Sequence, residues 1–121
     1  MPQRKLTYER GQICWVRLDP TLGAEVQKTR FCLIVQNDIM NQYGQLTVII
    51  PFRPGIKQAP YAVNIKANFA NGLDKDRFLD VAQIRSVDAQ RILGLVGVLE
   101  EDYWQMIQRA IDIVLGFIAK G

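Results

Sequence analysis

Hydrophobic residues change their spacing at Glu100, and this change constrains the fold more than any other feature of the sequence. From there on, Trp104, Ile107 and Ile111 recur three or four residues apart, which is the spacing of an amphipathic helix. Before it, short segments rich in β-branched and aromatic residues resemble strands. They cover residues 12–18, 31–36, 46–52, 61–65, 77–85 and 92–99. The sequence therefore predicts a mainly β (α+β) fold, with strands roughly within residues 12–99 and a C-terminal helix over roughly residues 100–119.

The length and composition exclude several kinds of site. The 121 residues suit a single domain over residues 1–121. The chain has no histidine, which excludes Ser-His-Asp and Cys-His catalysis. Cys14 and Cys32 lie in apolar segments, so we expect buried, reduced thiols. Two cysteines without histidine also leave a tetrahedral zinc site two ligands short, so we expect no metal and no cofactor.

The ends of the chain and its charge bear on location and partners. The first residues carry cations without the apolar stretch of a signal peptide, and no segment has the length of a membrane helix. We therefore expect a cytoplasmic protein without membrane contact. A net charge of +3 and a pI near 9.0 permit a polyanionic partner without demanding one.

Arginines stand at the ends of three predicted strands. Arg30 follows a long loop, residues 19–29, Arg53 follows the third strand, and Arg85 ends the fifth. In a simple up-and-down meander all three would share one rim of the sheet. A cluster of like charges does not help folding, whereas a guanidinium matches two phosphate oxygens at once. The alternative is that each arginine pairs with a nearby carboxylate, namely Asp19, Glu25 or Asp88. Taken together, the three favour an anion site that binds a phosphate.

An ordered set of short motifs runs along the chain from Arg10 to Phe117. The motifs are Arg10-Gly11-Gln12-Ile13 with Trp15, Leu18-Asp19-Pro20, Gly23-x-Glu25, Lys28-x-Arg30, Gln36-Asn37-Asp38, Ala82-Gln83-Ile84-Arg85-Ser86-Val87-Asp88, Arg91-Ile92 and Gly94 to Leu99. In this order and spacing the sequence resembles the MazF/PemK/Kid toxins of bacterial toxin–antitoxin pairs. The resemblance implies a small SH3-like barrel of the CcdB/MazF/PemK type with a C-terminal helix, working as a homodimer.

The same resemblance implies an activity and partners. Members of the family are sequence-specific, metal-independent endoribonucleases that cut single-stranded RNA, including mRNA. The ribose 2′-hydroxyl attacks the adjacent phosphorus and leaves a cyclic phosphate. A cognate antitoxin protein threads across the same groove and blocks it.

The resemblance also assigns candidate catalytic residues. The family's essential arginine falls on Arg30, but the family's usual Thr or Ser at the end of the third strand is replaced by Arg53. Arg53 could stabilise the developing charge on the phosphate. Alternatively, the nearby hydroxyl of Thr29 takes over the lost role, or the protein binds without cutting. Because arginine stays protonated, proton removal needs another group, and Glu25 on the loop is the nearest candidate. Glu25 could equally be paired with Lys28 or Arg30.

Further residues are candidates for contacts with RNA. The RNA-binding residues that we expect are Lys28, Thr29, Gln83 and Arg85. Trp15, Tyr43 and Tyr61 are interpreted as core or interface residues. Asp74, Asp76 and Asp80 are interpreted as a solvated loop at the opposite rim, and not as a magnesium site.

Two other functions compete with an RNA-cleaving toxin. One is a catalytically weakened MazF-like or CcdB-like binding protein, because Arg53 departs from the family pattern. CcdB proteins share the barrel but poison DNA gyrase, and the loop with Glu25 and Arg30 argues against that mode. The other is a plain SH3-like interaction module, which would be favoured if the rim arginines were paired internally.

Overall fold

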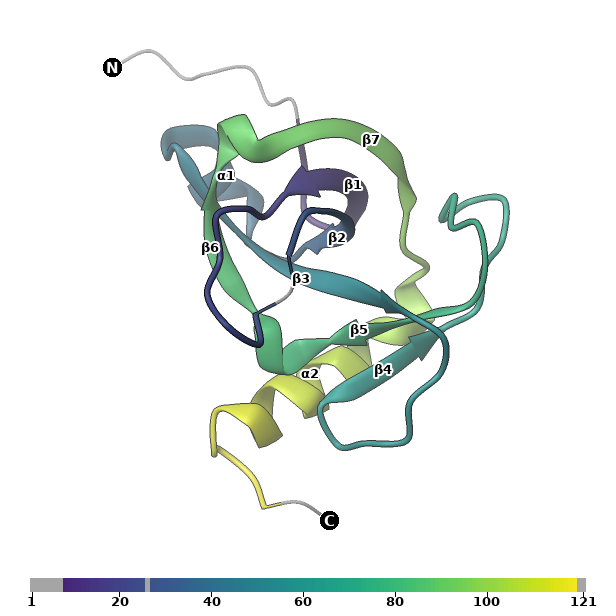
Figure 1. The fold of residues 1–121 in the computed structure, drawn as a ribbon. Coiled ribbons are helices and arrows are strands. Elements are labelled where there is room, and N and C mark those ends of the chain that lie inside the picture. Colours follow the sequence, from purple (N-terminus) through teal and green to yellow (C-terminus); the bar gives the residue numbers. More distant parts are fainter. Residues whose placement is uncertain (1–7, 26, 120–121) are drawn as a thin grey trace.

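The computed structural model describes residues 8–25 and 27–119, and within them an antiparallel sheet is packed against one C-terminal helix (Figure 1). The strands are β1 (Gln12–Arg17), β2 (Thr29–Ile34), β3 (Leu46–Pro54), β4 (Ala62–Ile65), β5 (Arg77–Asp80), β6 (Arg85–Asp88) and β7 (Ile92–Val98). The helices are α1 (Asp38–Tyr43) and α2 (Trp104–Val114), with short 3-10 turns η1 (Val81–Gln83), η2 (Ala89–Arg91) and η3 (Glu101–Tyr103). The predicted mainly β fold with a C-terminal helix is confirmed.

The sheet is not the simple meander that the sequence predicts. Its strand order is β4-β5-β3-β2-β1-β7, and β6 also pairs with β3. The first three strands follow one another as expected, but β3 then takes β5 and β6 as neighbours in place of β4. The sheet is therefore open between β4 and β7, while the curved strand β7 arches over β1 (Figure 1). This arrangement is consistent with a small SH3-like barrel.

The predicted strand over residues 77–85 is interrupted by the turn η1. Val81 is fully buried in this turn, and its backbone N–H donates to the carbonyl of Tyr61 at 2.9 Å. The Ile84 N–H bonds back to the Val81 carbonyl at 3.1 Å, so the turn satisfies its own backbone groups. Arg85 consequently begins β6 and does not end a fifth strand. Residues 86–88 belong to that strand, and the 3-10 turn η2 follows it.

Two hydrophobic clusters lie on opposite faces of the strands β1, β2 and β3. One lies under α2 and contains Leu33, Ile50 and Ile107. The other contains Ile34, Ile49 and both cysteines. Because adjacent residues of a strand point to opposite faces, β2 is buried on both sides, as its unbroken apolar sequence predicts.

The two thiols are directly opposite one another in the β1–β2 ladder. Cys14 pairs in register with Cys32, and both are free and buried. Burial raises the pKa of Cys14 to about 11. Burial, and then the neighbouring Cys14, raise the pKa of Cys32 further, against a smaller opposite effect of Arg85. The expectation of buried, reduced thiols is confirmed.

Helix α2 is shorter than the predicted range of residues 100–119. It ends at Val114, because Gly116 adopts a left-handed φ of +81°. The N–H of Gly116 bonds to the Ile113 carbonyl, and the N–H of Phe117 bonds to the Asp112 carbonyl at 2.8 Å, as in a Schellman C-cap. No helix in the described residues is long and apolar enough to cross a membrane.

A buried polar cluster joins α1 to the sheet. The side chain of Asn41 is fully buried, and its Oδ1 accepts hydrogen bonds from Gln36 Nε2 and from Thr47 Oγ1, both at 2.8 Å. Asn37 caps the helix by accepting from the Met40 N–H at 2.9 Å. Asn37 and Asp38 therefore begin a short helix.

Candidate phosphate-binding rim

The end of β1, the start of β2 and the end of β3 lie at one edge of the sheet, which we call the rim. Arg17, the last residue of β1, pairs with Thr29, the first residue of β2. Cys32 pairs with Pro51. Arg30 and Arg53 each lie two residues beyond that last pair, so they occupy the same end of adjacent strands. Exposed Arg17 adds a third cation that the sequence did not single out.

Arg30 is exposed on an otherwise buried strand. Its backbone pairs with Val16, and within the described residues its guanidinium has no ion pair or hydrogen bond. The next residue, Phe31, stacks on Trp15 with ring centroids 4.0 Å apart. Trp15 is 41% exposed, so it is not a core residue. Arg30 is thus, within the described residues, an uncompensated cation on the face of β2 opposite Phe31.

The loop between β1 and β2 folds on itself at Glu25. The Glu25 carboxylate accepts a hydrogen bond from the Leu22 N–H at 2.7 Å, and the Glu25 N–H donates to the Leu22 carbonyl at 3.1 Å. Glu25 is exposed and makes neither of the ion pairs considered above. Lys28 has a left-handed φ of +67°, and its carbonyl accepts from the Leu18 N–H at 2.8 Å, which closes the loop.

Two arginines from distant parts of the chain, one in β6 and one in η2, contact the base of this loop. Arg85 Nη1 approaches the Leu18 carbonyl at a long 3.5 Å. Arg91 Nη1 donates to the carbonyl of Arg17 at 3.1 Å and to that of Asp19. Arg85 therefore reaches the rim through its side chain, although its backbone pairs with Ile49 well inside the sheet. Arg91 belongs to the Arg91-Ile92 motif, but its contacts with the carbonyls of Arg17 and Asp19 are visible only in the tertiary structure.

Arg53 has an acidic partner. Its Nη1 lies 3.5 Å from Oδ2 of Asp80, which is only 4% exposed, while the Arg53 side chain is 48% exposed. The interpretation of Asp80 as part of a solvated loop at the opposite rim is wrong, because β5 and not β4 pairs with β3. The other two acids are exposed, as expected, but they lie at the same end of β3 as the rim, because Arg77 pairs with Pro54 and its guanidinium lies over Phe31. Asp74 binds Arg77, which lowers the pKa of Asp74, and Asp76 accepts from the Ala67 N–H.

The remaining predicted contacts occupy different places. Thr29 and Lys28 lie next to Arg30 in the chain, at the rim. Gln83 lies in η1, on the side of β3 away from β2, and is engaged in an interaction within the protein. Tyr43 is 64% exposed on α1, which is not a core position. In the part of the chain that the structure describes, no group of three or more His, Cys, Asp or Glu residues could hold a metal ion.

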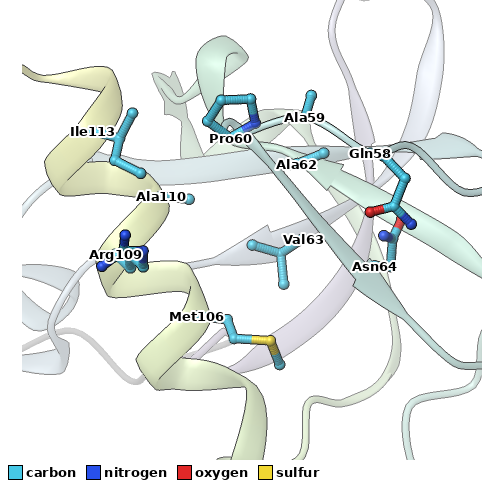
Figure 2. Close-up of a pocket in the computed structure, with 10 residues that line it drawn as sticks. All are labelled: Gln58, Ala59, Pro60, Ala62, Val63, Asn64, Met106, Arg109, Ala110 and Ile113. Atoms are coloured by element: carbon cyan, nitrogen blue, oxygen red, sulfur yellow. The ribbon is translucent and has the colours of Figure 1, made fainter. Parts of the chain in front are cut away.

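Two pockets lie near β4. One, of about 560 Å³, lies between α2 and β4, where Met106, Arg109 and Ile113 of the helix face Pro60 and Val63 (Figure 2). The other, of about 530 Å³, is lined by residues that include Arg53, Tyr61, Phe78 and Asp80. Only the second one includes a rim residue, namely Arg53.

Comparisons with known proteins agree with this geometry. A family model described as PemK-like, MazF-like toxin of type II toxin–antitoxin systems matches residues 9–115. Endoribonuclease MazF of Staphylococcus epidermidis is 30% identical over 108 residues, 88% of this chain and 90% of that protein. Endoribonuclease EndoA of Bacillus subtilis is 25% identical, over 91% of this chain and 96% of that protein.

Solved structures show the same fold. The crystal structure of MazF from Deinococcus radiodurans matches with a TM-score of 0.78 and 20% identity, over 93% of this chain and 99% of that chain. A mycobacterial endoribonuclease in complex with its cognate antitoxin matches with a TM-score of 0.75 and 17% identity, over 94% of this chain and 100% of that chain.

Proposed function

The chain belongs to the PemK-like, MazF-like toxins of type II toxin–antitoxin systems, and from this membership and the rim we propose that it is a sequence-specific endoribonuclease. Its substrate is single-stranded RNA, including mRNA, and its reaction is metal-independent. The similarity to MazF and EndoA endoribonucleases over about nine-tenths of the chain supports the activity. The rim supports the site of that activity.

The observation that carries this proposal is the free guanidinium of Arg30. It is exposed at the rim, and within the described residues it has no acidic partner. A cation without a counterion at a cationic edge attracts a polyanion. Its planar fork can bind two non-bridging oxygens of one phosphodiester. We therefore assign Arg30 to the scissile phosphate.

The proposed reaction needs no group that the chain lacks. The ribose 2′-oxygen forms a bond to phosphorus while the bond from phosphorus to the 5′-oxygen breaks, which leaves a 2′,3′-cyclic phosphate and a 5′-hydroxyl. Arg30 donates hydrogen bonds to the phosphate as its negative charge grows. The Glu25 carboxylate, held by the Leu22 N–H, accepts the proton of the 2′-hydroxyl, and the departing 5′-oxygen takes a proton from water.

The other rim residues bind and position. Arg53, in place of the family's usual hydroxyl residue, contributes a second donor to the phosphate. Lys28 and Thr29 adjoin Arg30 in sequence and contact the sugar–phosphate backbone or bases. Arg85 and Gln83 complete the RNA contacts on the other side of β3, and Arg85 also holds the loop through the Leu18 carbonyl.

The proposal extends to partners and location. The whole chain acts as one domain in the cytoplasm, where its RNA substrate is found, and a cognate antitoxin protein blocks the rim. We infer a homodimer, because β7 is a terminal strand of the sheet and exposes Leu93 and Leu95, which are 60% and 62% accessible. Exposed apolar residues on an unpaired strand edge favour pairing with another chain.

The test is cleavage of a long single-stranded RNA by the purified protein, with and without a chelator. We expect fragments with cyclic phosphate ends that form equally well with chelator. Arg30→Ala should lower the cleavage rate by on the order of a hundredfold or more without unfolding the protein. The matched control, Arg109→Ala, removes an exposed arginine of α2 and should cut as the wild type does. Undiminished cleavage by Arg30→Ala would refute the assignment of Arg30, and absence of cleavage by the wild type would refute the activity.

A further inference from the structure

Residues from three strands build a polar pocket on the face of the sheet that α2 does not cover. Phe52, Leu79 and Val63 form a row across β3, β5 and β4, and all three are buried in the cluster that contains Ile107 of α2. Adjacent residues point to the other face. Arg53 and Asp80 therefore face away from the helix, where they line the pocket of about 530 Å³.

The Asp80 carboxylate lines this pocket, and its hydrogen-bonding capacity is not fully used. It is 4% exposed, and its Oδ1 has no hydrogen-bond partner within the described residues. Oδ2 has only Arg53, at 3.5 Å. A buried carboxylate is costly unless it is fully paired. Its neighbours Leu79 and Val81 are completely buried apolar residues, so an apolar side chain would suit this position better for folding alone. The carboxylate is therefore better explained by a ligand that supplies a donor.

We propose that this Asp80 pocket holds one nucleobase of the RNA and selects a base that bears an exocyclic amino group. The inference rests on the proposed function, because it names what the same rim recognises. The volume suits a flat heterocycle. Tyr61 and Phe78 line the pocket and offer aromatic faces, and Arg53 and Lys57 offer charge to the flanking phosphates.

The chemistry of a carboxylate decides which bases are accepted. Cytosine, adenine and guanine each present an amino group, and a carboxylate accepts its hydrogen bond. Uracil presents carbonyl oxygens on both sides of its single ring N–H, and these repel the carboxylate oxygens. The Asp80 pocket therefore disfavours uracil.

Arg53 links this recognition to the phosphate. Its side chain is half-exposed and covers Asp80 through a loose contact, so it can turn toward the rim. When a base donates to Asp80, the carboxylate no longer depends on Arg53, and the guanidinium becomes available to the phosphate. A correct base in the pocket then promotes phosphate binding, which couples recognition to cleavage.

The test measures binding to uncleavable RNA. Labelled octamers with 2′-O-methyl groups cannot attack their own phosphates, so fluorescence anisotropy at one fixed salt concentration reports affinity alone. Three matched pairs isolate the amino group: oligocytidine against oligouridine, oligoadenosine against oligomers of purine riboside, and oligouridine with one guanosine against the same oligomer with one inosine. We expect the amino-bearing member of at least one pair to bind wild-type protein about tenfold more tightly.

Variants connect this preference to Asp80. Asp80→Asn should reduce the preference to about threefold or less, because an amide also donates to a uracil carbonyl. The control Asp102→Asn makes the same charge change at an exposed position of η3 and should keep the preference. Circular dichroism checks that each variant is folded, and Asp80→Leu replaces Asp80→Asn if the amide prevents folding.

Each outcome is decisive. If none of the three amino-bearing members binds better, or if both Asp80 variants keep the wild-type preference, the inference is wrong even though RNA cleavage stands. If the wild type neither binds nor cuts RNA, the proposed function itself has failed.

Discussion

Arg91 is a structural support of the candidate site, and its removal gives a quantitative test of how the loop is held. Arg91 Nη1 donates to the carbonyls of Arg17 and Asp19, on either side of the point where the chain leaves β1. Hydrogen bonds from a charged donor contribute about 1.5–3 kcal/mol each. Because Arg91 is partly exposed and both bonds come from one nitrogen, we expect Arg91→Ala to cost about 2 kcal/mol in free energy of unfolding, less than the sum of two such bonds.

This loss converts to a measurable shift in melting temperature. Unfolding entropy is about 2.1 cal/mol/K per residue, so 121 residues give about 0.25 kcal/mol/K. Arg91→Ala should therefore melt about 8 °C below the wild type when unfolding is followed by circular dichroism. The loop also carries Glu25, the proposed proton acceptor, and a misplacement of about 1 Å can cost about a hundredfold in rate. Cleavage should fall by about ten- to a hundredfold, although Arg91 does not touch the RNA.

Two controls separate the hydrogen bonds from the charge. Arg109→Ala removes an exposed arginine from α2 and should change stability by less than about 0.5 kcal/mol. Arg91→Lys keeps the charge but lacks the planar fork, and it should give an intermediate melting temperature. The reasoning is refuted if Arg91→Ala melts within about 2 °C of Arg109→Ala, because the carbonyl contacts would then contribute nothing.

Two further predictions concern the thiols and the assembly. The raised pKa values of Cys14 and Cys32 keep both groups as thiols rather than reactive thiolates at pH 8. A disulfide reagent should therefore label neither cysteine in the folded protein and both cysteines in guanidinium. Rapid labelling before unfolding would contradict their burial. Leu95→Glu places a charge on the exposed face of β7, and light scattering should detect a monomer for this variant and a dimer for the wild type; a monomeric wild type would show that the proposed dimer does not form.

The strands were predictable from the sequence because burial leaves a direct trace in hydrophobic spacing. The unbroken apolar run around Cys32 indicated a strand covered on both faces, which it is. The interruption at Val81 left no such trace, because that residue is buried as a strand residue would be. Gly116 is a residue that commonly ends a helix, but apolar residues continue at helical spacing past it. The sequence therefore predicted a helix that is too long.

The candidate site was predictable only in part, because it depends on which strands pair. Arg30 and Arg53 belong to adjacent strands joined in chain order, so their common edge follows from the meander assumption. Asp80 belongs to a strand that enters out of order, and that assumption placed it at the wrong edge. The support that Arg91 gives to the loop joins residues more than seventy positions apart, and no local pattern predicts such a contact.

The buried polar cluster around Asn41 has a consequence for the register in which β2 pairs with β3. A strand with one apolar face is held in place because a slip of one residue would turn that face to water. β2 lacks this safeguard, since Leu33 and Ile34 are both completely buried. A one-residue slip of β2 would instead separate Asn41 from the side chains of Gln36 and Thr47. Each buried polar group left without a hydrogen bond would then cost about 1–3 kcal/mol. One apolar residue of these strands can therefore replace another, whereas the three polar residues fix the register of the strands.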